Sequence, residues 1–425
     1  MISRRRVLQA LGAGAALGLP GCASVRHPPS AAKVVVVGGG YAGATAAKYL
    51  RLLSNHAIDV ILIEPKEQFI SPALSNLVIG GELQMSDITC SYQQLQRRHG
   101  VGLVHDQVAS IDTDRHTVAL KHGAPIRYDR LVLAPGIEVL LDAVDGLSEA
   151  RAAGRIVQAW SAGSETEALN RQLLAMRDGG VFVITIPEAP YRCPPAPYER
   201  ASLVASFLQR YRPASKVLVL DANQDVSAMG SLFKQAWAEH YPNLLEYRSH
   251  YNAVAVDPHS LTVRFDVQED VRADVLNVLA PVRAGALAVQ AGLANVNGRW
   301  CEVDYLTFAS TRARHVHVLG DSIQAAPMMP KSGHMANAQA KVAAAAIVAE
   351  FMEQPIDPHP MLTNTCFSFV NASAAVHSAT VYEYVAAVSS FRPVHGAGGT
   401  SPAPSALEGS YALSWARNVW ADMLL

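Results

Sequence analysis

The chain has 425 residues, of which half are hydrophobic and only 17% are charged, and its formal net charge is −1 at pH 7. This length is enough for about two or three domains with a sizeable core. A near-neutral chain without a block of like charge argues against nucleic-acid binding, which needs a basic face. Five cysteines are too few for a disulfide scaffold, although two that meet in an oxidising compartment can form a bond.

The first 31 residues have the pattern of an export signal and linker. Arg4, Arg5 and Arg6 precede a short apolar run, Ala10–Leu19, which is typical of a secretion signal. The paired arginines favour the twin-arginine route, with an ordinary Sec signal as the alternative. The run is shorter than the ~20 residues of a membrane helix, so we expect a periplasmic protein with no transmembrane span in the mature chain. Cys22 follows a sequence that resembles a lipobox and is a candidate lipid anchor.

The next stretch predicts a dinucleotide-binding unit. Its strand, turn, helix and second strand are Lys33–Val37, Gly38–Gly43, Ala44–Leu53 and Asp59–Ile63. Gly38, Gly40 and Gly43 have G-x-G-x-x-G spacing, which allows a tight turn, a close approach to phosphate and helix–strand packing. Glu64 ends the second strand at the distance expected of the acid that binds a ribose hydroxyl.

Two later segments indicate which nucleotide is bound. The strand that begins near Tyr128 ends in a turn with Pro135 and Gly136, and the strand His315–Leu319 is followed by Asp321. This pair resembles the closing segments of flavoproteins with two dinucleotide-binding folds, such as the disulfide reductases. The resemblance implies FAD, with Asp321 on its ribityl chain.

A helix is expected to begin at Ser332 and to run to about Met352. Its positive end would point at whatever precedes it. If that is the flavin pyrimidine ring, the helix dipole stabilises the negative charge of the reduced flavin. An ordinary core helix capped by Ser332 is the alternative.

A second unit repeats the strand–helix–strand order without the glycines. We expect its elements at Val181–Ile186, Ala201–Tyr211 and Lys216–Leu220, with Asp221 where an NAD-ribose acid would stand. The turn after the first strand contains Cys193 and four prolines instead. Prolines lack the backbone N–H that a pyrophosphate needs, so we expect no use of NAD(P)H and a small reductant that reaches Cys193.

The tail supplies further cysteines. A proline-rich break at Pro355–Pro360 precedes Cys366, which is the natural partner for Cys193, with Cys90 and Cys301 as other candidates. A disulfide near a flavin can accept a nucleophile and pass on two electrons. The apolar residues between 412 and 424 lie on one helical face, which favours core or a docking surface.

Several stretches resemble the flavoprotein subunit of flavocytochrome c sulfide dehydrogenase, a family related to sulfide:quinone oxidoreductase and the disulfide reductases. They are Lys33–Gly43, Leu74–Asn76, Ile79–Gly81, Arg192–Pro195, Pro197–Ser202, Met329–Gly333 and Asn364–Cys366. The resemblance covers essentially the whole mature chain, and the cysteine–proline and tail motifs are more specific than the glycine pattern.

The resemblance implies a periplasmic enzyme that binds FAD, oxidises hydrosulfide at a redox disulfide and reduces a c-type cytochrome subunit. By residue match, Cys193 and Cys366 would be the redox pair, Glu199 the nearby acid or base, and Trp415 would lie close to the flavin. Lys331, Ser332 and Gly333 would contact the cofactor, and no metal site is assigned. The family's flavin-attaching cysteine is replaced by Pro72, so we expect FAD to be held without a covalent bond.

The expected fold is α/β, with two dinucleotide-binding-type (Rossmann-like) domains and a C-terminal α+β interface domain. The expected boundaries are 32–145 with 283–354 for a discontinuous FAD domain, 146–282 for the second domain and 355–425 for the last. Two other functions stay open: a sulfide:quinone oxidoreductase, and a non-catalytic exported flavin-binding partner of a haem protein.

Overall fold

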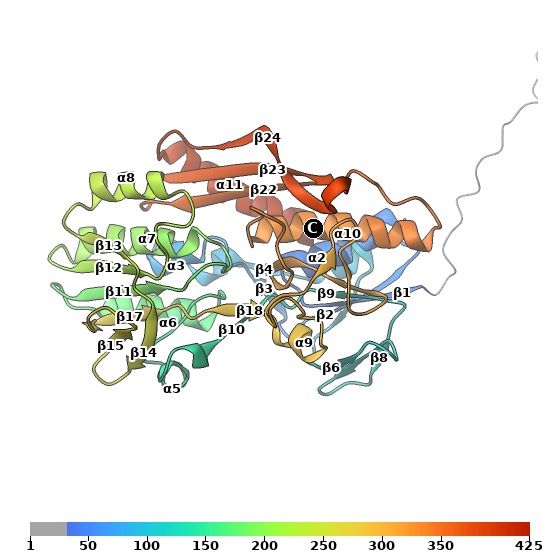
Figure 1. Cartoon of the computed structure of the whole chain (residues 1–425), viewed down its shortest axis with the longest axis horizontal. Coiled ribbons are helices and arrows are strands. Elements are labelled where there is room, and N and C mark those ends of the chain that lie inside the picture. Colours follow the sequence, from blue (N-terminus) through green and yellow to red (C-terminus); the bar gives the residue numbers. More distant parts are fainter. Residues whose placement is uncertain (1–31) are drawn as a thin grey trace, which may run out of the picture.

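The computed structural model describes residues 32–425, so the proposed export signal and Cys22 lie outside the described residues. Two α/β units lie side by side and a C-terminal sheet runs across both (Figure 1). In the described part, the first unit has a seven-stranded sheet in the order β19 (Val303–Asp304), β20 (Ala309–Ser310), β21 (Val316–Val318), β9 (Arg130–Leu133), β1 (Lys33–Val37), β2 (Asp59–Ile63) and β5 (Gly102–Val104). From β21 to β5 the strands are parallel.

The β1–α2–β2 unit follows from its sequence. Val34–Val37 are almost fully buried, because a central parallel strand is covered on both faces. Helix α2 (Tyr41–Leu53) begins three residues before the start expected from the sequence, directly after the glycine turn. Gly43 is needed for this packing, since a Cβ there would lie 1.8 Å from the carbonyl oxygen of Gly38.

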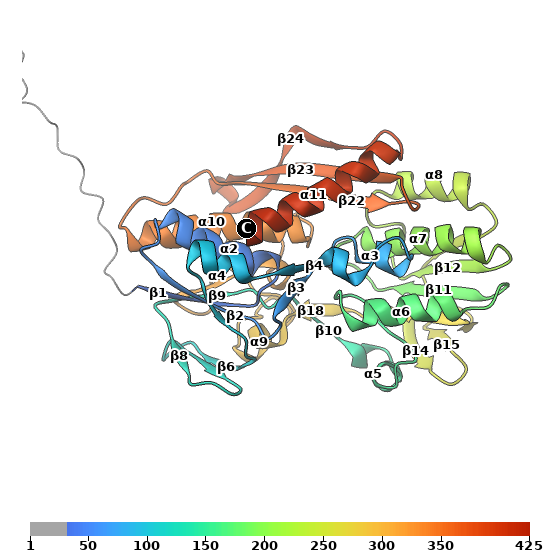
Figure 2. The ribbon, with the colours of Figure 1, turned by 180° about the vertical axis from the view of Figure 1, so that it is seen from behind.

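The helix α10 (Gly333–Phe351) packs along α2 above the sheet. The opposite side of the sheet carries a small antiparallel sheet and a short helix (Figure 2). The remaining elements of this unit are β3 (Gln68–Ile70), α3 (Ser75–Ile79), η1 (Met85–Ile88), β4 (Thr89–Ser91), α4 (Gln93–His99), β6 (Val108–Asp112), β7 (Thr117–Leu120), β8 (Ile126–Arg127), α9 (Ala286–Gln290) and η3 (Gly320–Ser322).

The second unit has a parallel sheet in the order β13 (Leu245–Ser249), β12 (Lys216–Asp221), β11 (Val181–Ile186) and β17 (Val275–Val278). Its remaining elements are η2 (Leu141–Ala143), α5 (Leu147–Ala152), α6 (Ser164–Ala175), α7 (Ala196–Tyr211), α8 (Gly230–His240), β14 (Ala253–Asp257), β15 (Thr262–Phe265) and β16 (Val271–Arg272). The strands β10 (Ile137–Val139) and β18 (Val282–Ala284) pair in antiparallel fashion where the chain passes between the units.

The expected start of α7 at Ala201 is wrong, because the helix begins at Ala196. Pro195 is its N-cap and Pro197 lies in its first turn. Prolines are tolerated there, since the first N–H groups of a helix have no intrahelical partner. The proline-rich turn is therefore shorter than expected, and Glu199 belongs to the helix.

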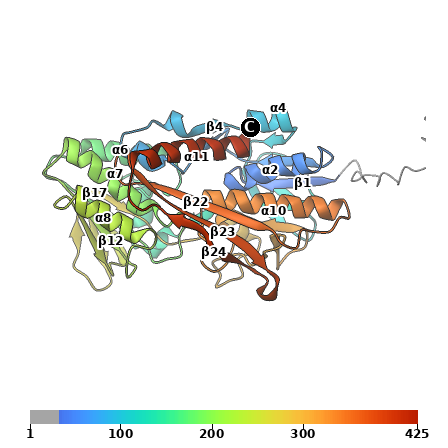
Figure 3. The ribbon, with the colours of Figure 1, turned by 90° about the horizontal axis from the view of Figure 1, so that it is seen from above.

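The C-terminal unit is an antiparallel sheet of β22 (Met361–Phe369), β23 (Ala375–Val385) and β24 (Ser390–Thr400), which η4 (Ala386–Val388) and α11 (Ala406–Leu424) complete. Seen from above, sheet and helix lie over both α/β units (Figure 3). Lys48 of α2 donates to the carbonyl of Asp422 at 2.7 Å, and Tyr241 of the second unit donates to the carbonyl of Val370 at 2.9 Å. The tail is thus anchored to both units.

The expected fold class is confirmed: two dinucleotide-binding-type units and a C-terminal α+β unit are present. The apolar face of α11 is buried as its spacing predicts, through Ala412, Ala416, Val419, Trp420, Met423 and Leu424. None of the helices within residues 32–425 is long and apolar enough to cross a bilayer.

Candidate active site

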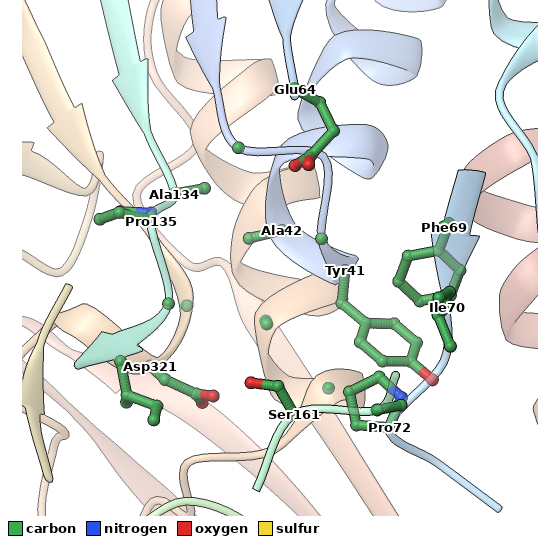
Figure 4. Close-up of a pocket in the computed structure, with 18 of the residues that line it drawn as sticks. Tyr41, Ala42, Glu64, Phe69, Ile70, Pro72, Ala134, Pro135, Ser161 and Asp321 are labelled. Carbon is green, nitrogen blue, oxygen red and sulfur yellow. The ribbon is translucent and has the colours of Figure 1, made fainter. Parts of the chain in front are cut away.

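Two adjoining cavities lie between the units: the first and second units line the first cavity, and all three units line the second. Tyr41, Pro72, Arg192 and Gly333 line both of them. Most of the proposed cofactor residues line the first cavity, which Figure 4 shows: Gly38, Gly40, Glu64, Pro135, Gly136, Asp321 and Gly333. The proposed catalytic residues line the second.

The glycines of the first cavity differ in what they do. Gly38 has a φ of +97°, and a Cβ there would lie 2.4 Å from the carbonyl oxygen of Ala134. Gly43 does not line the cavity and serves helix packing. A Cβ at Gly40 would meet nothing within 4 Å, so the protein itself does not require a glycine there. The open space at Gly40 fits a bound phosphate that approaches the backbone.

Two acidic side chains face the same cavity. Glu64 accepts hydrogen bonds from the backbone N–H groups of Gly39 (2.7 Å) and Lys66 (3.0 Å), and it points toward the glycine turn (Figure 4). Asp321 has one carboxylate oxygen, Oδ1, that is buried without a partner. Because buried polar atoms are normally hydrogen-bonded, this oxygen fits a hydroxyl group of a bound ribityl chain.

The N-terminus of α10 reaches both cavities. The Ser332 hydroxyl accepts a hydrogen bond from the Met335 N–H at 3.1 Å and donates to Asn364, so Ser332 caps this helix, as the alternative interpretation has it. Lys331 lines the second cavity. Its ammonium donates to the carbonyls of Asp321 and Ile323, and burial lowers its pKa to about 8.

The turn between β11 and α7 places Cys193 in the second cavity. Cys193 has a φ of +47°, which is uncommon for a residue with a side chain. Its N–H donates to the Lys331 carbonyl at 2.6 Å and its carbonyl accepts from Ala196 at 2.9 Å. These bonds hold the turn that carries the thiol.

Cys366, on β22, lines the same cavity. Asn364 donates to its sulfur at 3.4 Å. Burial raises the pKa of both thiols, and at Cys193 the nearby Cys366 raises it further. Both are free thiols in the structure, so a disulfide between them stays a prediction. Cys90 and Cys301 do not line this cavity, so among residues 32–425 Cys366 is the thiol that shares it with Cys193.

Glu199 lies in the first turn of α7 and is 9% exposed. Its carboxylate accepts hydrogen bonds from the Phe369 N–H at 2.8 Å and from the Asn76 amide at 2.6 Å. Burial raises its pKa to about 7, while these hydrogen bonds oppose that shift. A carboxyl group in this state can exchange a proton near neutral pH.

Trp415, on α11, lines the second cavity. Its ring lies 5.8 Å from that of His334 and 5.9 Å from that of Phe367. The indole N–H is buried and has no partner among the described residues, so a donor is available to a molecule in the cavity.

At the corresponding turn of the second unit, the acidic residue is enclosed by the protein's own side chains. Asp221 is fully buried. Its oxygens accept from the hydroxyls of Tyr198 (2.7 Å) and Tyr247 (3.1 Å), and from both nitrogens of Asn223. Tyr191 extends this network through Ser227 at 2.6 Å. The acid that would bind a ribose is thus occupied by the protein's own side chains.

The sequence analysis missed several residues of these cavities. Arg192 lies 3.6 Å from Asp321, measured from its Nε to Oδ2, and it borders both cavities. Asn76 reaches Glu199 from α3, and the His334 ring nitrogen Nδ1 accepts from the Thr365 N–H at 2.9 Å. Each is adjacent to or inside a motif that was noted, but only the tertiary structure shows which way its side chain points.

Models of three known protein families match parts of this chain. The chain matches the family model "Sulfide dehydrogenase (flavocytochrome c) flavoprotein chain, central" over residues 166–280, and "Flavocytochrome c sulphide dehydrogenase, flavin-binding" over 358–424. Residues 32–174 match "Pyridine nucleotide-disulphide oxidoreductase".

Among relatives, the chain is 54% identical over 46 residues to the sulfide dehydrogenase (flavocytochrome c) flavoprotein chain of Chlorobaculum thiosulfatiphilum. That match covers 94% of the relative's sequence and 11% of this chain. This chain is also 26% identical over 299 residues to the mitochondrial sulfide:quinone oxidoreductase of Dictyostelium discoideum. That match spans 68% of this chain and only 65% of the relative. The mouse counterpart is 23% identical and is also matched over 65% of its length.

A solved structure, the sulfide:quinone oxidoreductase of Aquifex aeolicus, superposes with a TM-score of 0.75 at 19% identity, covering 92% of this chain and 91% of that one. At this identity the likeness shows the fold. The family models and the Chlorobaculum relative carry the assignment further. The chain belongs to the family of the flavoprotein chain of flavocytochrome c sulfide dehydrogenase.

Proposed function

We propose that this protein is a periplasmic, FAD-dependent sulfide dehydrogenase that oxidises hydrosulfide at Cys193 and Cys366 and passes the electrons to a c-type cytochrome. The observation that carries the proposal is the shared cavity of these two cysteines. That cavity adjoins the one formed by the nucleotide-binding glycine turn. A thiol pair next to a flavin site is what two-electron oxidation of a sulfur nucleophile requires.

FAD is supported by the open space at Gly40 and the unpartnered oxygen of Asp321. When bound, FAD supplies an acceptor for two electrons that can be re-oxidised one electron at a time by a haem. The residues that line the first cavity include no cysteine, and Pro72 borders both cavities. We therefore propose non-covalent binding.

In the proposed sulfur chemistry, hydrosulfide attacks a disulfide between Cys193 and Cys366. The S–S bond between the cysteines breaks, a new S–S bond forms as a persulfide, and the other cysteine leaves as a thiolate. Glu199 faces this cavity and accepts the proton of the hydrosulfide. Loss of the outer sulfur at the zero-valent level leaves both cysteines as thiolates. Their oxidation back to the disulfide releases the two electrons that a bound FAD would accept.

The electron acceptor has a second candidate. The sulfide:quinone oxidoreductase relatives favour a quinone, whereas the two family models named for flavocytochrome c favour a cytochrome. We propose the cytochrome, because those two models cover the central and C-terminal parts of the chain.

An anaerobic sulfide titration of the purified holoprotein tests the function. We expect the flavin absorbance to bleach with one equivalent of sulfide, and colour to return faster with oxidised cytochrome c than with a short-chain quinone. If the flavin colour returned faster with the quinone, the electron acceptor would be a quinone and not a cytochrome. If sulfide did not bleach the flavin, the proposed enzyme activity would be wrong. The remaining function would be that of a flavin-binding partner of a haem protein. Cell fractionation of the full chain, with a substitution of Arg4 and Arg5 by Lys, tests the periplasmic location.

A further inference from the structure

The Asn76 side chain lies between two consecutive buried residues of α7. Its amide nitrogen donates to Glu199 Oε2 at 2.6 Å, and its amide oxygen accepts from Arg200 Nε at 3.1 Å. Asn76, Glu199 and Arg200 are 4%, 9% and 3% exposed. The carboxylate and the guanidinium are therefore joined through an amide in a buried setting.

Arg200 fixes the orientation of this amide. Its other nitrogens donate to the carbonyls of Gln158 (3.0 Å) and Ala159 (2.7 Å) and to Asn277 Oδ1 (2.8 Å). A guanidinium has only donors, so the oxygen of the Asn76 amide must face Arg200. The NH₂ group is then left to face Glu199. The orientation follows from hydrogen-bond chemistry.

The surroundings of Glu199 act on its protonation in opposite directions. Burial and the charges of Cys193 and Cys366, when ionised, oppose a carboxylate here. Three groups favour the carboxylate form of Glu199: the Phe369 N–H on β22, the Asn76 amide on α3 and Arg200 on the same helix. Hydrogen bonds to the charged form stabilise that form, and of these three only the Asn76 amide can be changed without moving the backbone or the buried cation.

We propose, on the basis of the function above, that Asn76 is a positioning residue that, oriented by Arg200, keeps Glu199 ready to accept a proton beside Cys193 and Cys366. Asn76 touches none of the reacting atoms in this scheme. It acts through Glu199. Without the hydrogen bond from Asn76, the Glu199 carboxyl group stays protonated at neutral pH and cannot take a proton from the incoming hydrosulfide.

The test measures the protonation of Glu199 in the reduced, sulfide-free holoprotein by infrared spectroscopy. The band of the protonated buried carboxyl is identified by its loss in Glu199→Gln. Asn76→Asp keeps the shape of the side chain and its contact with Arg200 but replaces the NH₂ donor. We expect the pH midpoint of the Glu199 carboxyl band to rise by about one pH unit or more in this variant, since a hydrogen bond to the charged carboxylate is lost. The double variant with Glu199→Gln separates the new carboxyl's own band. Asn76→Leu should shift the midpoint in the same direction.

The matched control is Asn295→Asp, because Asn295 also donates its amide to a glutamate, Glu302, at 3.0 Å, but at an exposed position. It should leave the midpoint unchanged. The pH profile of flavin reduction by sulfide should move with the infrared midpoint in Asn76→Asp. An unchanged midpoint in both Asn76 variants would overturn the proposal. Since the infrared measurement needs no sulfide, it decides this proposal even if sulfide fails to reduce the flavin.

Discussion

The backbone N–H of Cys193 donates a hydrogen bond to the carbonyl of Lys331 at 2.6 Å. The ammonium of the same lysine donates to the carbonyls of Asp321 and Ile323. Its nitrogen also lies 3.7 Å from the centre of the Trp300 ring, in a cation–π contact. One residue thus fixes both the thiol turn of the second unit and the acidic turn of the first. This contact explains why Cys193 keeps a left-handed backbone, which costs about 1–3 kcal/mol and persists only where the surroundings enforce it.

The two glycines of the nucleotide turn should respond differently to alanine. Gly40→Ala places a methyl group in open space, so the apoprotein should unfold at the same or a slightly higher denaturant concentration, while FAD affinity falls at least tenfold. Gly43→Ala places it against the Gly38 carbonyl and should destabilise the fold by several kcal/mol, an overpacking at the upper end of the usual range. Denaturant melts and FAD titrations of both apoproteins give the comparison. Equal losses of stability would contradict it.

The flavin should be released when the protein is denatured. Pro72 stands at the position where the family's attaching cysteine is expected, and the first cavity has no thiol among its lining residues. Precipitation with acid should therefore leave the yellow colour in the supernatant, and mass spectrometry of the chain should give the mass of the unmodified polypeptide. A pellet that keeps its flavin after washing would show a covalent bond.

The protein should not oxidise NADH or NADPH. Asp221 is held by Tyr198 and Tyr247, and the turn with Cys193 has prolines where a pyrophosphate needs N–H groups. Stoichiometric NADH added without oxygen should leave the flavin spectrum unchanged over minutes, whereas dithionite on the same sample bleaches it. Rapid bleaching by NADH would mean that the tyrosine network opens to admit a nucleotide.

The stability of the protein should depend on pH through Glu199. Its pKa is raised from 4.5 to about 7 in the folded state, so between these values the folded protein holds a proton that the unfolded chain has released. The stabilising contribution is present below pH 4.5 and is lost as pH rises through 7. From pH 5 to pH 8 the wild type should lose about 2 kcal/mol of unfolding free energy more than Glu199→Gln does. If urea unfolding at pH 5 and pH 8 showed the same loss of unfolding free energy in the wild type and in Glu199→Gln, the raised pKa of Glu199 would be excluded.

The sequence predicted the first cavity better than the second. Gly38, Gly40 and Glu64 belong to one local strand–turn–helix–strand unit, so their spacing fixes their geometry. Residues such as Asn76 and Arg192 act through contacts between distant segments, which no local pattern specifies. The expected start of α7 at Ala201 lies five residues after the true start at Ala196, because the first turn of a helix tolerates the prolines found there. Lys331 lines the second cavity, and only the tertiary structure shows that its ammonium binds the carbonyls of Asp321 and Ile323.

The most direct measurement is made on Cys193→Ser, with flavin content and sulfide oxidation determined on the same sample. Cys193 does not line the first cavity, and serine is nearly isosteric with cysteine, so FAD should stay bound at the wild-type ratio per chain. A serine forms neither a disulfide nor a persulfide, and the thiolate is the reactive species, so sulfide-dependent bleaching and cytochrome reduction should fall to background. If the variant keeps its flavin and most of its rate, Cys193 is a structural thiol and the central claim is wrong.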